Sequence, residues 1–260
     1  MIMNKTRCFA FGCSYTRHVW ASWADFIGVN FDEYYNYGRG GASNTFIMNR
    51  LFELDKLANF NPDTDYILIM ITGIDRFSYV DKKTGDWALN GEIYNYSQHH
   101  ENLVISEFVK NMWNEKWAIY MSWIAISAMK TFLQSKNLKH SIVQGVDNQY
   151  NKQPLNQLAL EKVNDIYKML TIQESMDAFI GENKNLRDVK FDLNNFIDGH
   201  PNQQAHFNFV SKHFPEFVTS KTIDTFNTLT RQFDFTSREN QASKYNTFFD
   251  NLRKISYQLY

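Results

Sequence analysis

The sequence predicts an α/β fold, namely a three-layer α/β/α sandwich around a central parallel sheet. Short apolar runs of strand length alternate with segments whose apolar residues recur every three or four positions. This alternation is typical of parallel strands joined by crossover helices. With 260 residues, 43% of them hydrophobic, the chain is long enough to bury one sizeable core. We therefore expect one α/β domain with additions.

The first half of the chain predicts three strands and two helices. Residues 66–71 form a continuous apolar run, which is typical of a central strand covered on both faces. Ser43 precedes an apolar periodic run through Leu57, and serine is a favoured residue at a helix N-cap. The other elements are strands at about 6–12 and 33–37, and a helix carrying Trp20, Trp23, Phe26 and Ile27 on one face.

The second half predicts longer helices and one more strand. Residues 81–100 are expected to form a loop insertion, and one or two long helices follow from about 102 to 134. A strand is expected at 141–145, and a helix at about 155–179.

These elements suggest a division of the chain into two parts. Residues 1–217 form the α/β domain, with a helical and aromatic insertion at about 80–135. Residues 218–260 form a C-terminal accessory segment that reads as mixed helix with Phe and Tyr on one side. This segment is either an accessory element or an oligomerisation surface. Whether the protein forms a homo-oligomer is therefore an open question at this point.

Charge and hydropathy narrow the classes of partner. The formal net charge is -1 and the isoelectric point is near 6.7, which leaves no basic footprint for nucleic acid or an anionic membrane. The longest mostly apolar stretch, 117–129, is interrupted by Ser122 and Ser127 and is too short to span a bilayer. We expect no nucleic-acid partner and no membrane span.

The cysteines and the N-terminus point to a reducing compartment. Cys8 and Cys13 lie five positions apart around one predicted strand, and they are too few and too awkwardly placed for a disulfide framework. Lys5 and Arg7 are not followed by a long apolar segment before that strand, so no secretory signal is visible. The predicted location is the cytoplasm.

The first candidate for chemistry is Ser14, in the run 12–16 directly after the apolar residues 8–11. A serine on the turn at the carboxyl end of a parallel strand is exposed where ligands bind, next to the N–H groups of the helix expected to follow. Ser14 would be a nucleophile there, or it would simply cap that helix. The neighbouring thiol of Cys13 is a second candidate nucleophile, or a small buried apolar group.

The second candidate lies in the run Asp198-Gly199-His200-Pro201-Asn202. In an extended segment residues two apart project to the same side, so Asp198 could reach the imidazole of His200 and fix its tautomer. Folding could then bring Ser14 and His200 together. The alternatives are a surface-loop histidine, or a metal site made with His206, which otherwise belongs to the following helix.

A glycine-rich block at 36–44 supplies candidate oxyanion donors. The N–H of Gly41 could join that of Ser14 in holding a developing oxyanion. Asn44 would be a third donor, or a residue of the helix start. The simpler reading of the block is an ordinary turn between a strand and a helix.

These runs resemble the SGNH hydrolases, also called GDSL-like lipases and acylhydrolases. Ser14 matches the family's nucleophile, Gly41 its oxyanion-hole glycine, and His200 with Pro201 its histidine block. Cys13, Asp75 and Ile197 stand where the family has aspartate, asparagine and the acid of its triad. Variants of this kind are similar to SGNH-like proteins encoded by phages. The resemblance implies a flavodoxin-like three-layer sandwich and a hydrolase without cofactor or metal.

The resemblance implies two readings of function. In the first, Ser14 attacks an ester of a small molecule or a carbohydrate O-acyl group, His200 is base and then acid, and Asp198 orients His200. In the second, the scaffold has lost its catalytic site and serves binding or structure, for example in a virus particle, which would place it in the host cytoplasm or the virion.

Residues 71–76 also resemble a segment of the family, and they contain Asp75, the residue that most disfavours catalysis. Asp75 replaces an amide donor with a carboxylate, and a charge there would repel the oxyanion. We expect Asp75 to point away from the site and to pair with Arg76 or Arg39. Asp75, Arg76 and Cys13 are candidate lining residues. Aromatic and histidine side chains of the insertion would line a substrate cleft or cover the core, namely Trp87, Tyr94, Tyr96, His99 and His100.

Overall fold

The computed structural model describes residues 5–18, 20–92, 103–146, 157–181, 183, 186, 189–191 and 196–232, with the backbone alone described at 90–92, 103–105, 189–191 and 196–198. The core of the fold is a four-stranded parallel sheet in the order β2-β1-β3-β6. Its strands are β1 (Arg7–Phe11), β2 (Glu33–Asn36), β3 (Asp65–Ile71) and β6 (Lys139–Gln144). The predicted α/β class with a central parallel sheet is confirmed.

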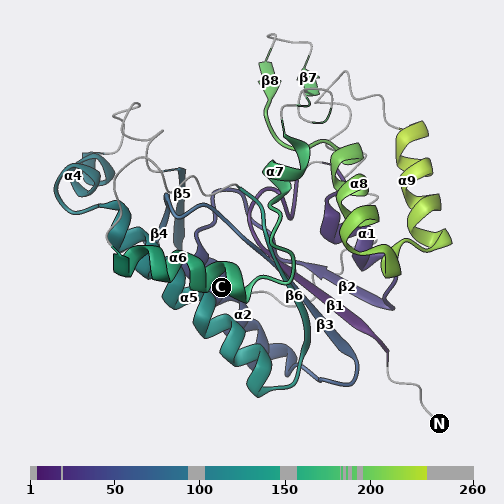
Figure 1. Cartoon of the computed structure of the whole chain (residues 1–260), viewed down its shortest axis with the longest axis horizontal. Helices are drawn as coiled ribbons and strands as arrows, with labels where there is room; N and C mark the ends of the chain where they lie inside the picture. Colours follow the sequence, from purple (N-terminus) through teal and green to yellow (C-terminus); the bar gives the residue numbers. More distant parts are fainter. Residues whose placement is uncertain are drawn as a thin grey trace.

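Helices cover both faces of this sheet, which gives three layers (Figure 1). One face carries α2 (Asn44–Ala58), α5 (Glu115–Ser135) and α6 (Gln157–Met169), which pack on one another in that order. The other face carries α1 (Trp23–Gly28), with α8 (Gln203–His213) and α9 (Ser220–Gln232) packed against it. The fold therefore leaves the two ends of the strands as the places where loops gather.

Strand β3 lies between β1 and β6 and is buried over almost its whole length. The side chains of 67–71 are fully inaccessible, because helices cover both faces of the strand. The prediction of a central strand from the apolar run at 66–71 is confirmed.

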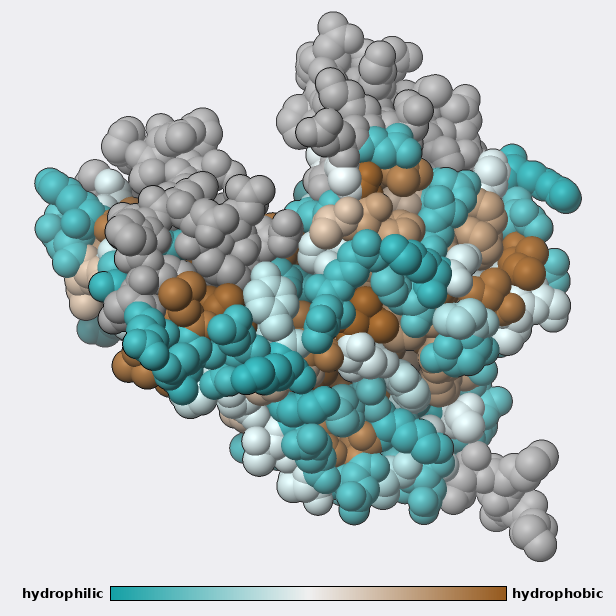
Figure 2. Space-filling view, in the orientation of Figure 1, coloured by the Kyte–Doolittle hydropathy of each residue, from teal (hydrophilic) through white to brown (hydrophobic). Residues whose placement is uncertain are grey.

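Smaller elements lie around the three layers. They are a hairpin of β4 (Arg76–Val80) and β5 (Trp87–Glu92), helices α4 (Leu103–Asn111) and α7 (Met176–Ile180), a hairpin of β7 (Val189–Phe191) and β8 (Phe196–Asp198), and a 3-10 turn (Pro215–Phe217). In the view of Figure 2, hydrophilic residues cover much of the described surface, with smaller hydrophobic areas between them.

Three expectations about single elements need correction. The first helix begins at Trp23 with Ser22 as its N-cap, so Trp20 precedes it. The expected loop at 81–100 contains β5, and its residues 93–100 lie outside the described residues. The single helix expected at 155–179 is divided into α6 and α7, because Thr171 between them exchanges hydrogen bonds with Ile142 on the edge of β6.

The remaining helices agree with the sequence. Ser43 caps α2 by accepting from the N–H of Phe46, as predicted. Where one or two long helices were expected at 102–134, the structure has the short helix α4 and the long helix α5, and α5 belongs to the main helical layer. Helix α9 packs on α1, and the division of the chain at 217/218 stays a prediction.

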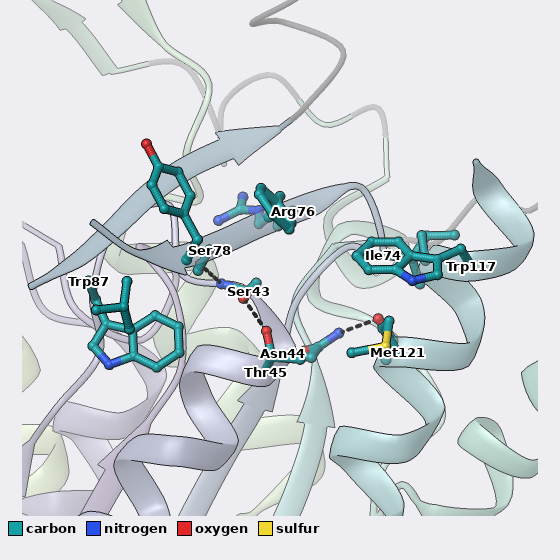
Figure 3. A pocket seen from close by; sticks show the side chains of 14 residues that line it. Ser43, Asn44, Thr45, Ile74, Arg76, Ser78, Trp87, Trp117 and Met121 are labelled. Atoms are coloured by element: carbon teal, nitrogen blue, oxygen red, sulfur yellow. Dashed lines mark hydrogen bonds between the residues drawn. The ribbon is translucent and has the colours of Figure 1, made fainter. Parts of the chain in front are cut away.

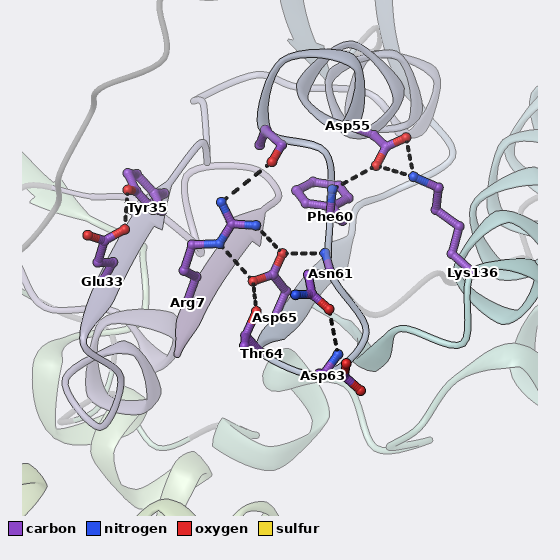
Figure 4. A network of polar contacts seen from close by, with 11 residues as sticks. Arg7, Glu33, Tyr35, Asp55, Phe60, Asn61, Asp63, Thr64, Asp65 and Lys136 are labelled. Carbon is purple, nitrogen blue, oxygen red and sulfur yellow. Dashed lines mark hydrogen bonds and ion pairs between the residues drawn. The ribbon is translucent and has the colours of Figure 1, made fainter. Parts of the chain in front are cut away.

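The amino ends of β1 and β3 are held by a closed ionic network (Figure 4). Arg7 donates from Nε and Nη2 to the two carboxylate oxygens of Asp65, over 2.8 and 2.6 Å. The Asp65 side chain is fully buried and also accepts from the N–H of Asn61 and the hydroxyl of Thr64. Nearby, Lys136 pairs with Asp55 at 2.6 Å and so fastens the end of α5 to α2.

Within the described residues, none of the helices combines the length and the apolar character needed to cross a membrane. The apolar stretch at 117–129 belongs to α5, whose inner side packs against α2 and α6. Its Trp117 and Ile124 side chains are 38% and 48% exposed. This segment is therefore a half-buried amphipathic helix.

Candidate active site

Ser14 lies on a tight turn that follows β1. The carbonyl of Cys13 accepts from the N–H groups of Thr16 and Arg17, which closes a single helical turn over residues 13–17. Ser14 is partly exposed on this turn. Since Ser22 caps α1, the alternative that Ser14 caps that helix is wrong, and Ser14 does not lie at the start of α1.

The Cys13 side chain is not accessible to a substrate, as a nucleophile would have to be. Its side chain is fully buried in the hydrophobic core, as is that of Cys8. Burial, with the carboxylates of Asp25 and Asp65 adding to it, raises the pKa of the Cys8 thiol well above its usual value. The structure therefore gives Cys13 the small apolar role, and both thiols are packing groups.

His200 meets Ser14 across 186 positions of sequence. Its Nε2 atom lies 2.8 Å from the Ser14 hydroxyl oxygen, within hydrogen-bond distance. His200 is partly exposed, and it sits on the bend between β8 and α8. The expected proximity of these two side chains is confirmed.

Aromatic side chains on the Ser14 segment hold the His200 segment in place. The indole N–H of Trp20 donates to the carbonyl of Pro201 over 2.8 Å, and this bond is buried. Tyr15 presents its ring edge to the His200 ring, with centroids 5.5 Å apart, and its hydroxyl donates to Asp177. The His18 ring lies 4.5 Å from the His200 ring on another side. The sequence offered no signal for these contacts beyond the closeness of the three residues to Ser14.

Asp198 is the last residue of β8, two positions before His200. Its backbone pairs with Val189, in an extended segment as expected. Its side chain lies outside the described residues, so its contact with His200 stays a prediction.

His206 belongs to α8 and is buried, as the helix reading predicted. The pKa of His206 is lowered to about 3, mainly by burial and then by the nearby His18 and His200 rings, while Asp25 acts in the opposite direction. His206 is therefore a neutral imidazole at ordinary pH. The part of the chain that the structure describes contains no cluster of metal-ligating side chains.

The glycine block approaches the Ser14 turn closely. The N–H of Arg39 donates to the carbonyl of Gly12 over 2.9 Å. A Cβ atom on Gly38 would lie 2.9 Å from the Cβ of Thr16 and from the backbone N of Arg17, so only glycine fits there. Gly41 has a positive φ of 76°, which glycine adopts without strain. The block thus places Gly41 on a loop that is bonded to the loop of Ser14.

A buried polar network supports both loops from below. The amide of Asn36 donates to the carbonyl of Thr16 and to Asp25, and its oxygen accepts from the N–H of Gly38. Ser22 donates to the same Thr16 carbonyl. Buried hydrogen bonds therefore hold the Ser14 turn and the glycine-rich block at 36–44 in a fixed position relative to each other.

The side chain of Asn44 is hydrogen-bonded within the protein. Its amide nitrogen donates to the carbonyl of Thr72 and to the hydroxyl of Ser122, and its oxygen accepts from the N–H of Thr72. These bonds tie the start of α2 to the end of β3 and to α5. Because both amide hydrogens are engaged, we leave Asn44 out of the oxyanion hole.

Asp75 and Arg76 follow the end of β3, at the entry to the β4–β5 hairpin. The direction of the Asp75 carboxylate and its pairing with an arginine stay predictions. Arg76 lines a pocket of about 250 Å³ beside the start of α2 (Figure 3). The lining of this pocket includes neither Ser14 nor His200.

The aromatic insertion is partly accounted for. Trp87 lines this pocket and also packs on the core, with its ring edge-on to Phe46. The other expected lining residues, Tyr94, Tyr96, His99 and His100, lie outside the described residues.

The arrangement has the parts that acyl transfer needs. A partly exposed hydroxyl contacts an imidazole nitrogen that can take its proton, and backbone N–H groups lie on the two adjoining loops. The donor and acceptor in the Ser14–His200 bond depend on the tautomer of the ring. With the proton on Nδ1, Nε2 accepts from the serine hydroxyl.

Known proteins show little similarity to this chain. No family model and no curated protein matches the sequence. Among solved structures, a protein from Desulfitobacterium hafniense DCB-2 that is named for the G-D-S-L family of lipolytic proteins is similar, with 12% sequence identity and a TM-score of 0.42. The match covers 82% of this chain and 99% of that chain. Similarity this low assigns neither a family nor an activity.

Proposed function

We propose that the protein is a serine hydrolase of ester bonds, with Ser14 as nucleophile and His200 as general base. The observation that carries this proposal is the 2.8 Å contact between the Ser14 hydroxyl and His200 Nε2, formed at the carboxyl end of β1. A serine hydroxyl is a weak nucleophile on its own and needs such a base within hydrogen-bond reach.

The reaction proceeds in two halves. His200 takes the Ser14 proton while Oγ attacks the ester carbonyl, and the N–H groups of Ser14 and Gly41 hold the oxygen of the tetrahedral intermediate. His200 then gives the proton to the leaving alcohol as the C–O bond breaks. Water, deprotonated by His200, attacks the acyl carbon next, and Ser14 leaves with its proton restored.

The surroundings of His200 suit this role. The Trp20–Pro201 hydrogen bond and the Tyr15 edge contact fix the segment that carries the ring. A ring held in place before substrate binds avoids reorganisation during the reaction. In the same proposal Asp198 accepts from Nδ1 of His200, which selects the tautomer with Nε2 free to act as base.

The proposed substrate class is an ester of a small molecule or a carbohydrate O-acyl group. A second candidate function is that of a binding or structural scaffold without hydrolysis, for example in a virus particle. It is favoured by the engagement of Asn44 with Thr72 and Ser122, which removes a side-chain donor from the hole. Losing one such donor typically costs about 2.7–4 kcal/mol of transition-state stabilisation.

Hydrolysis of p-nitrophenyl acetate by the purified full chain distinguishes the two. We expect weak turnover in the native protein and none above background in Ser14→Ala. Ser211→Ala is the matched control, because that serine is exposed on α8 and its hydroxyl donates to the carbonyl of Phe207 in the same helix. Turnover that survives in Ser14→Ala refutes the nucleophile, and its absence from the native protein favours the scaffold.

A further inference from the structure

The pocket beside the start of α2 lies at the same end of the sheet as the Ser14 turn. Its lining begins at Ser43, two residues after Gly41, and continues with Ile74, three residues after β3 ends. Its far wall is the β4–β5 hairpin and the first turns of α5. The pocket is therefore lined by residues that directly follow the loop carrying Gly41 in the sequence.

The walls of the pocket are mainly aromatic. Trp87 stands on one side and Trp117 on the other, as Figure 3 shows, and Phe77 and Tyr79 come from β4 between them. These rings are supported from behind, because Phe46 packs edge-on to Trp87 and Phe108 stacks on Phe77 with centroids 4.5 Å apart. The shape of the pocket is thus set by packed rings, and it suits an apolar body.

Among the described residues of this apolar lining, Arg76 is a cation with no acidic side chain beside it. Arg76 extends over Ser43 in Figure 3, and its Nε atom is buried with no hydrogen-bond partner. Among the described residues no ion pair reaches Arg76, and the lining contains no Asp or Glu. The residue paired with Arg76 across the hairpin is Glu92, whose side chain lies outside the described residues.

The start of α2 adds to this imbalance. Helix α2 has no acidic residue in its first turn, although the N-terminus of a helix carries a partial positive charge. The Ser43 and Asn44 side chains at this end are already bonded to Thr45, Thr72 and Ser122. An anionic group reaching Arg76 would satisfy its buried Nε donor, which has no hydrogen-bond partner in the part of the chain that the structure describes.

We propose that this pocket binds the acid-bearing arm of the substrate, with an aromatic or aliphatic body between Trp87 and Trp117 and a carboxylate on Arg76. This inference rests on the proposed function, because it makes the pocket a subsite of the proposed active site. It narrows the substrate class to esters that carry a carboxylate on a short apolar arm.

Binding of 3-phenylpropionate and of 3-phenylpropanamide to the full chain tests the charge requirement. The two probes have nearly the same size and differ in charge, and quenching of tryptophan fluorescence reports both. We expect the carboxylate to bind at least about tenfold more tightly than the amide, as a charge-assisted hydrogen bond implies. Arg76→Gln should remove this difference, and Arg76→Lys should keep part of it.

Arg231→Gln on α9 is the matched control and should bind both probes as the native protein does. Melting temperatures show whether each variant is folded. Equal affinity for the two probes in the native protein, or an undiminished preference in folded Arg76→Gln, would overturn the carboxylate site. The retained charge in Arg76→Lys keeps the test decisive if Arg76→Gln does not fold.

The link to catalysis is tested separately. We expect 3-phenylpropionate to inhibit hydrolysis of p-nitrophenyl acetate competitively, and Ser14→Ala to bind it as tightly as the native protein does. Binding without any effect on measurable hydrolysis would refute the subsite. Charge-dependent binding in a protein that hydrolyses no ester would instead refute the proposed function and leave the carboxylate site in place.

Discussion

The two ends of the central sheet use similar residues in opposite ways. At the amino ends of the strands, Arg7 and Asp65 satisfy each other through two hydrogen bonds, and Lys136 pairs with Asp55. At the carboxyl ends, Ser14 and His200 are partly exposed, and Arg76 has a buried donor with no partner. One end is closed by its own charges, whereas the other leaves polar groups available to a ligand.

This difference separates stabilising groups from groups available for chemistry. The charged groups of a buried ion pair that makes all its hydrogen bonds cannot also bind a substrate. Removing one partner leaves the other as an uncompensated buried charge. A hydroxyl, an imidazole and a guanidinium at an open edge contribute little to stability and can act on what binds there. Changes at the two ends should therefore affect different measurements.

The largest expected effect is at the open end. His200→Ala should lower kcat for p-nitrophenyl acetate by about a thousandfold, since a positioned general base contributes roughly 10²–10⁴. Stability should change little because His200 is partly exposed. Steady-state kinetics and urea unfolding of the same preparation measure both. A variant that keeps most of its activity would show that another group accepts the Ser14 proton.

The next effect is at the closed end and reverses this pattern. Asp65→Ala should lower the free energy of unfolding by about 3 kcal/mol, because it leaves Arg7 without its buried partner. Ester hydrolysis by the folded variant should be unchanged. The control is Asp165→Ala, whose ion pairs with Lys162 and Lys168 are at the surface of α6 and should be worth less than about 1 kcal/mol.

Urea unfolding curves for Asp65→Ala and Asp165→Ala decide this prediction. Equal losses in the two variants would show that the Arg7–Asp65 pair is no stronger than a surface pair. A loss of hydrolysis in folded Asp65→Ala would break the separation between the two ends.

A smaller effect concerns His206, a buried residue of α8. The pKa of His206 is lowered to about 3 in the folded protein, mainly by burial, so below its ordinary value near 6.5 the unfolded chain binds the proton more readily. Stability is therefore lost as the pH falls from about 6.5 towards 3. At pH 5 this group should cost about 2 kcal/mol relative to pH 7.

His206→Leu removes this titration and isolates its contribution. The difference in unfolding free energy between pH 7 and pH 5 should be smaller in this variant than in the native protein by that amount. An identical pH dependence in the two proteins would mean that the buried imidazole is not held neutral.

The smallest expected effect is at Asp75. If the backbone N–H groups of Ser14 and Gly41 make up the oxyanion hole, Asp75→Asn should leave kcat/KM for simple esters unchanged or raise it, because a negative charge near the site is removed. Kinetics with p-nitrophenyl acetate measure this. Loss of a robust activity would show that the carboxylate itself takes part in the reaction.

The sequence predicted correctly those helices and strands that depend on a local sequence pattern. The apolar run at 66–71 predicted the central strand, and Ser43 predicted the start of α2. The pairing of Ser14 with His200 was foreseen because each lies in a short motif. The break between α6 and α7 was not, since it depends on a bond from Thr171 to Ile142 that no local pattern shows.

Two residues near the site make contacts that their local sequence does not show. Asn44 bonds Thr72 and Ser122, and Trp20 bonds Pro201, and these partners lie far along the chain. An amide next to a glycine motif looks like a free donor until its partners are known. Tertiary hydrogen bonds therefore decide which candidate polar groups remain available.

The central claim is that Ser14 is a nucleophile activated by His200, and covalent labelling with a fluorophosphonate tests it most directly. Attack by Ser14 Oγ on phosphorus forms the P–O bond and expels fluoride, so mass spectrometry should find one adduct on the peptide that contains Ser14. The adduct should be absent from Ser14→Ala, much slower in His200→Ala and unchanged in Ser211→Ala. Equal labelling of Ser14→Ala, or no labelling of the folded native protein, would contradict the account.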